Sequence, residues 1–132
     1  PWFNRESLEG VAESLSEKLT KLTLIGTSVD DIALAGLALF SRLHTVALGN
    51  LKATTKIGLM KFLGDDRVAA RTRNLFFCDL DVTNDLAAFF TPFENLRILF
   101  IGNALMGIPG PKDIFKNETL VRNRVECADW YG

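Results

Sequence analysis

Apolar positions recur with a fixed spacing through the second half of the chain. The offsets 0, 3, 5 and 8 are occupied by Thr72, Leu75, Phe77 and Leu80 and, 24 positions later, by Leu96, Leu99, Ile101 and Ala104. Alternate residues of a strand point to the same side, so each set predicts a short strand with one buried face. Between the two sets, steps of four, four and three separate Val82, Leu86, Phe90 and Phe93. That spacing is typical of the buried stripe of a short helix.

The same apolar pattern occurs earlier in the chain. Segment 29–43 aligns with segment 82–96 at five apolar positions: Val29 with Val82, Ala33 with Leu86, Leu37 with Phe90, Phe40 with Phe93 and Leu43 with Leu96. Two further strand patterns lie at Leu19, Leu22, Leu24 and Thr27 and at Leu43, Val46, Leu48 and Leu51. We therefore predict four short parallel strands beginning near residues 20, 44, 73 and 97, each followed by a helical arm.

The predicted arms differ in length. The arm over 29–40 is expected to turn Ile32 toward the core, and the longer arm over 52–71 is expected to bury Ile57 in a full helix that ends in a turn at 64–66. A helix over 5–18 caps the first strand or belongs to a preceding repeat. After a turn-rich interruption at 107–111, a last short helix is predicted from Phe115, Leu120, Val121 and Val125, followed by Trp130 and Tyr131.

This spacing resembles the leucine-rich repeat, LxxLxLxxN followed by a helical arm. The 24-residue spacing is similar to that of F-box and other cytosolic leucine-rich repeat proteins, and the 29-residue spacing to the ribonuclease-inhibitor type. The resemblance implies an α/β solenoid with about four parallel strands on the concave face, helices on the convex face and helical terminal caps. It also implies a single domain over 1–132. Because the chain opens at Pro1 without a methionine, we expect a segment of a larger protein.

Composition narrows the classes of protein. A hydrophobic content of 48% with 23% charged residues is typical of a folded domain, and a net charge of −1 gives no electrostatic case for nucleic acid or an anionic membrane as the main partner. No apolar run reaches the roughly 18 residues of a membrane span, so no membrane partner is expected. Cys78 and Cys127 lie far apart and outside any metal-ligand spacing, which favours a reducing compartment, the cytoplasm or the nucleus.

The sequence offers no catalytic constellation. His44 is the single histidine and has no nucleophile or acid placed beside it by a recognisable motif. The Gly-Asn pairs at 49–50 and 102–103 lack the downstream lysine of a phosphate loop. We therefore expect no enzyme activity, no metal and no cofactor.

The candidate site is the outward face of the predicted sheet. Phe76 and Phe100 share the same outward offset on neighbouring strands, with Ile98, Asn74 and Cys78 around them and Asp79 at the following turn. A contiguous apolar patch on an exposed sheet usually marks an interaction surface. These six residues are the predicted partner-binding residues. The alternative is that a terminal or flanking segment of the same protein covers the two rings.

The predicted function is a non-catalytic module that binds a protein or peptide on its concave face. An alternative is an RNA-associated adaptor, since some mRNA-export receptors carry a leucine-rich repeat domain that touches RNA. It would use the arginines of the second half, Arg67, Arg71, Arg73, Arg97, Arg122 and Arg124. The nearby Asp79, Asp81 and Asp85 favour a solvated face of mixed charge instead. A substrate receptor of a ubiquitin ligase would need an F-box, which this chain lacks.

Overall fold

The computed structural model describes residues 17–26, 28–102 and 110–129 and contains one parallel β-sheet. Its strands are β1 (Lys21–Ile25), β2 (Thr45–Gly49), β3 (Asn74–Cys78), β4 (Ile98–Gly102) and β5 (Glu126–Asp129). The helical segments are α2 (Asp31–Ala35), the 3₁₀ helix η1 (Gly36–Leu39), α3 (Lys56–Leu63), α4 (Asp66–Arg71), the 3₁₀ helix η2 (Asn84–Phe90), α5 (Lys112–Phe115) and α6 (Glu118–Arg122). The predicted α/β class is thus confirmed.

The strands lie side by side in the order of the chain, and every neighbouring pair is parallel. Lys21 pairs with Thr45, 24 positions further along, and Thr45 pairs with Asn74, 29 positions further along. The four predicted strands are confirmed, each beginning one residue after the expected position. Among the described residues, the sheet nevertheless has five strands rather than four, because β5 pairs with β4 at the C-terminal end.

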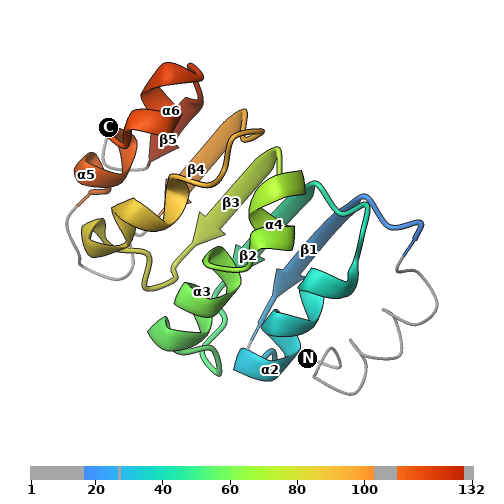
Figure 1. Cartoon of the computed structure of the whole chain (residues 1–132). Coiled ribbons are helices and arrows are strands. Elements are labelled where there is room, and N and C mark those ends of the chain that lie inside the picture. The colour runs from blue at the N-terminus through green and yellow to red at the C-terminus, as the bar shows by residue number, and fades with distance from the viewer. Residues whose placement is uncertain (1–16, 27, 103–109, 130–132) are drawn as a thin grey trace.

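The connections between strands carry the helical segments. Figure 1 shows α2, α3 and α4 on the same face of the sheet. The arms also pack on one another in chain order, α2 on α3, α3 on η2, and η2 on α5. The expected helix within 52–71 is two helices, α3 and α4, separated by the predicted turn, and Asp65 caps the second through its side chain. The arm at 82–93 forms a 3₁₀ rather than an α-helix.

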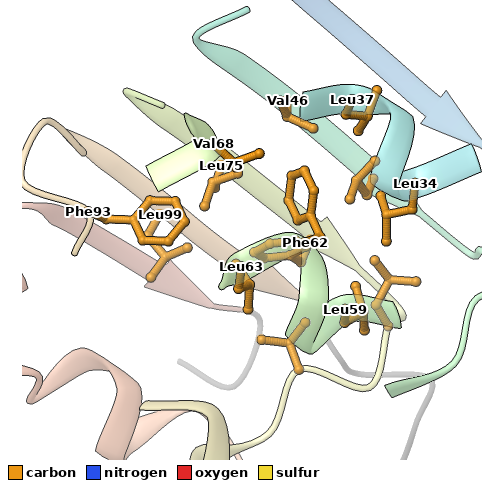
Figure 2. Close-up of a cluster of buried hydrophobic side chains, with 14 of the residues drawn as sticks. Leu34, Leu37, Val46, Leu59, Phe62, Leu63, Val68, Leu75, Phe93 and Leu99 are labelled. Carbon is orange, nitrogen blue, oxygen red and sulfur yellow. The ribbon is translucent and has the colours of Figure 1, made fainter. Parts of the chain in front are cut away.

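The core lies between the sheet and these arms (Figure 2). Leu75 and Leu99, paired in the sheet, project into it beside Phe62 and Leu63 of α3. All ten residues of the five aligned pairs of segments 29–43 and 82–96 are at most 2% exposed. A shared set of buried positions in two segments 53 residues apart explains why the two connections return the chain to the sheet in the same way.

A second regularity follows the strands. The residue after β1, β2 and β3 has a positive φ: Gly26 (125°), Asn50 (51°) and Asp79 (53°). Each of these residues donates its backbone N–H to the last carbonyl of the next strand, over 2.8 to 3.2 Å. Glycine, asparagine and aspartate tolerate the left-handed region better than other residues, so the sequence permits this turn three times. Asp79, a predicted binding residue, therefore lies in a turn past the end of β3.

Side-chain hydrogen bonds join successive arms to one another. The carboxylate of Asp31 in α2 accepts hydrogen bonds from the backbone N–H (2.7 Å) and the hydroxyl (2.5 Å) of Thr55, the N-cap of α3. Asn95 donates to the carbonyl of Ala70 (2.6 Å), and Asn117 donates to that of Ala87 (2.8 Å). These bonds satisfy groups at helix ends that would otherwise lack partners.

Some expectations for individual residues were wrong. Ile32 and Ile57 are 55% and 64% exposed, because α2 and α3 turn Leu34 and Leu59 toward the core instead. The last short helix, predicted from Phe115 to Val125, is divided, because Phe115 ends α5 and residues 118–122 form α6, where Val121 is 62% exposed. Residues 126–129 form β5, a strand outside the four that were predicted. The expected helix over 5–18 lies almost entirely outside the described residues, as do Trp130 and Tyr131.

Candidate interaction surfaces

The face of the sheet turned away from the core is termed the open face. Three rows of side chains cross it. The first row is Lys21, Thr45, Asn74, Ile98 and Glu126; the second is Thr23, Ala47, Phe76, Phe100 and Ala128; the third is Ile25, Gly49, Cys78 and Gly102. All are partly or well exposed except the two glycines. The expected outward offsets are therefore correct.

Phe76 and Phe100 are direct partners across β3 and β4, and both are partly exposed. Ala47 and Ala128 flank them in the same row. Because alanine side chains are short, the two rings are the bulkiest side chains of their row. Adjacent strands lie about 4.8 Å apart, so the two rings form one apolar ridge across the middle of the sheet.

The other predicted residues surround this ridge. Ile98 lies beside Asn74 in the first row, and the Asn74 amide donates to the hydroxyl of Thr45 (2.9 Å), which is also 2.9 Å from Nδ1 of His44. Cys78 lies in the third row as a free thiol, and its burial, with Asp79 next to it, raises its pKa. A thiol with a raised pKa is a poor nucleophile at neutral pH. The structure thus brings Asn74, Phe76, Cys78, Ile98 and Phe100 onto one surface.

A second surface lies where the chain enters the strands. A hollow of about 1010 Å³ is lined by Thr20, Arg42, His44, Ala70, Arg71, Arg73, Glu94, Asn95, Leu96, Arg97, Asn123, Arg124 and Glu126. We call it the arginine hollow. The residues that precede β1 to β4 contribute one side chain each: Thr20, His44, Arg73 and Arg97. Their backbones continue the hydrogen-bond ladder of the sheet. The N–H groups of His44, Arg73 and Arg97 donate to the carbonyls of Thr20, His44 and Arg73, respectively, over 2.7 to 3.0 Å.

The arginines singled out from the sequence have different environments. Arg67 forms an ion pair with Asp65 (3.0 Å), and Arg122 forms one with Glu94 (2.7 Å). Arg71 donates to the backbone carbonyls of residues 37, 38 and 43 over 2.7 to 3.1 Å, and its burial lowers its pKa.

Arg73, Arg97 and Arg124 meet in the hollow, together with Arg42, which the sequence had not grouped with them. The residue spacing gives no signal for Arg42, because it lies 31 positions before Arg73 and joins the hollow only through the pairing of β2 with β3.

The aspartates considered as counter-charges are elsewhere. Asp79 and Asp81 lie after β3, at the opposite end of the strand from Arg73, beside a second hollow that also contains Asn50 and Lys52. Asp85 forms an ion pair with Lys56 (2.6 Å), and the hydrogen bond from that lysine lowers the pKa of Asp85. The two ends of the sheet thus carry opposite charge.

Among the described residues, no three potential ligands cluster as a metal site. In the same part of the chain, every helix is too short or too polar to cross a membrane. Comparison of the chain with protein-family models, with curated proteins and with solved structures gave no significant match.

Proposed function

We propose that this chain is a short leucine-rich repeat solenoid that acts as a non-catalytic interaction module, with a protein or peptide bound on its open face. The solenoid assignment is supported by the parallel strands in chain order, by the repeated buried positions of the connections and by the left-handed residue after three successive strands. In such folds each coil packs only on its neighbours, and the extended sheet face is the usual binding surface.

The observation that carries the proposal is the ridge formed by Phe76 and Phe100. The core does not need these rings, since the inward offsets of the same strands already supply Leu75, Phe77, Leu99 and Ile101, all buried. Aromatic side chains are enriched among the residues that dominate interface energies. The two free cysteines support a location in the cytoplasm or nucleus, where thiols stay reduced.

The test is a selection of random displayed peptides on the wild-type protein, followed by affinity measurements on variants. Burying an aromatic side chain contributes roughly 1.5–3 kcal/mol, and about 1.4 kcal/mol is a tenfold change in affinity. We expect Phe76→Ala and Phe100→Ala each to weaken binding of the selected peptides about tenfold or more. A matched control is Ile57→Ala, which truncates an exposed side chain on α3 and should leave the affinity within about twofold.

Melting curves of the same variants separate binding from folding. Both phenylalanine variants should melt close to the wild type. Unchanged affinity combined with a loss of several kcal/mol of stability would mean that the rings are covered within the protein, and the proposal would then be wrong. The binding surface would have to be sought at the turns that carry Asp79 and Asp81.

A further inference from the structure

The arginine hollow concentrates positive charge in a protein whose net charge is −1. Five arginines and two glutamates line it, which gives the lining a net charge of +3 with His44 neutral. One of the glutamates, Glu94, already accepts two hydrogen bonds from Arg122 and one from Asn123. The positive charge of the hollow is therefore only weakly offset by its own acids.

Arg73 and Arg97 contribute two of these charges at adjacent positions. They lie directly before β3 and β4, and the backbone N–H of Arg97 donates to the carbonyl of Arg73 (2.7 Å). Neither guanidinium forms an ion pair with another described residue, and the same is true of Arg42 and Arg124. A bound anion would pair with these guanidinium groups.

We infer that the arginine hollow binds an acidic peptide segment with several carboxylates. The hollow reaches from the start of β1 to the start of β5, a distance of about 19 Å at about 4.8 Å per strand. That length suits an extended acidic segment of five or six residues at about 3.3 Å per residue.

The lining favours a peptide over a nucleic acid. A peptide can donate its backbone N–H groups to Glu94 and Glu126, whereas the backbone of a nucleic acid carries a phosphate at every residue and no N–H group. Asn95, Asn123 and Thr20 offer amide and hydroxyl groups for the backbone of a peptide. Arginine pairs with carboxylates through two parallel hydrogen bonds, which fixes the segment in place.

The experiment measures the anisotropy of a labelled hexaglutamate peptide titrated with the full chain at about 0.05 M ionic strength, where charges are only weakly screened. Hexauridylate with a 5′-phosphate, which carries one phosphate per nucleotide against one side-chain carboxylate per glutamate, is the comparison ligand. We expect saturable binding of hexaglutamate, tighter than that of hexauridylate. The double variant Arg73→Gln/Arg97→Gln should weaken it at least tenfold. The control Arg67→Gln removes one positive charge outside the hollow and should change the affinity less than twofold.

Stability supplies a second measurement that does not depend on the double variant folding well. Hexaglutamate should raise the melting temperature of the wild type but not of the single variant Arg97→Gln, since a ligand stabilises only the state that binds it. Tighter binding of hexauridylate, equal losses in the Arg67→Gln control, or no binding of hexaglutamate would overturn the inference. None of these outcomes touches the proposed function, because the peptides selected on the open face are tested separately through Phe76 and Phe100.

Discussion

Gly58 provides a sharp test of how successive arms pack. It lies in α3, buried, at the point where α3 meets α2. A Cβ built there would approach three atoms of Asp31 within 3.0 Å, a separation that real Cβ atoms essentially never show. Asp31 could move aside only by giving up its two hydrogen bonds to Thr55. Glycine inside a helix ordinarily costs about 0.5–1 kcal/mol relative to alanine. Whether Gly58→Ala stabilises or destabilises the protein therefore depends on this contact with Asp31.

The expected magnitude follows from the two lost bonds. Hydrogen bonds to charged groups contribute about 1.5–3 kcal/mol each. Because the two bonds between Asp31 and Thr55 are exposed to solvent, and exposed charged pairs contribute little, we expect them to contribute about 2 kcal/mol together. After the gain in helix propensity, Gly58→Ala should destabilise the protein by about 1–2 kcal/mol. In an Asp31→Ala background the same change should stabilise it, by about 0.5–1 kcal/mol.

Urea denaturation of the four proteins of this double-mutant cycle measures both effects and their coupling. The single variant Asp31→Ala also serves as the control for loss of the Thr55 bonds alone. If Gly58→Ala stabilises the wild-type protein by as much as it stabilises the Asp31→Ala variant, α2 and α3 do not approach each other as closely as described.

Three further outcomes are expected. Leu99→Ala should lower the free energy of unfolding by about 2–5 kcal/mol, whereas His44→Ala should stay within about 0.5 kcal/mol, and similar losses in a denaturation series would mean that inward and outward positions are misassigned. Arg71→Lys should destabilise by about 2 kcal/mol because an ammonium cannot reach three carbonyls at once; a melting curve like that of the wild type would refute this role. The hydrogen bond from the Arg67 side chain lowers the pKa of Asp65, so its carboxylate stabilises the fold above about pH 4 and loses that effect as the pH falls through the lowered pKa. The Asp65→Asn variant should therefore be less stable than the wild type near neutral pH, and the difference in free energy of unfolding should shrink in acid. Denaturation of both proteins at neutral and at acid pH measures this difference, and a constant difference would contradict the role of the carboxylate.

The strands were predictable because their inward residues are large and apolar. β3 and β4 each place two such residues at the offsets 3 and 5, and the sheet pairs them in the expected register. β5 could not be found in the same way. Its pairing with β4 puts Cys127 opposite Leu99 and Asp129 opposite Ile101, so an edge strand with a small and a charged residue carries no leucine pattern.

The candidate surfaces were predictable to different degrees. The rings of Phe76 and Phe100 share a surface because one offset repeats, and a repeat is visible in the sequence. The arginine hollow draws Arg42, Arg73, Arg97 and Arg124 from the segments before four different strands. Arg73 and Arg97 share one offset of the 24-residue repeat, whereas Arg42 and Arg124 do not follow it. Which arginines are neutralised also depends on partners such as Asp65 and Glu94, which only the folded chain brings close.

The strict chain order of the sheet has a consequence for how the protein folds. Every described strand pairs only with strands that precede or follow it directly, so the paired residues are only 24 to 29 positions apart in the chain. Doubling a loop adds only about 0.6 kcal/mol to the entropy cost of closure, so the longer connection with two helices slows assembly little. Native structure can therefore spread strand by strand from the middle of the sheet. Within the described sheet, β1 and β5 each adjoin a single strand, so these two edge strands should join late and fray first.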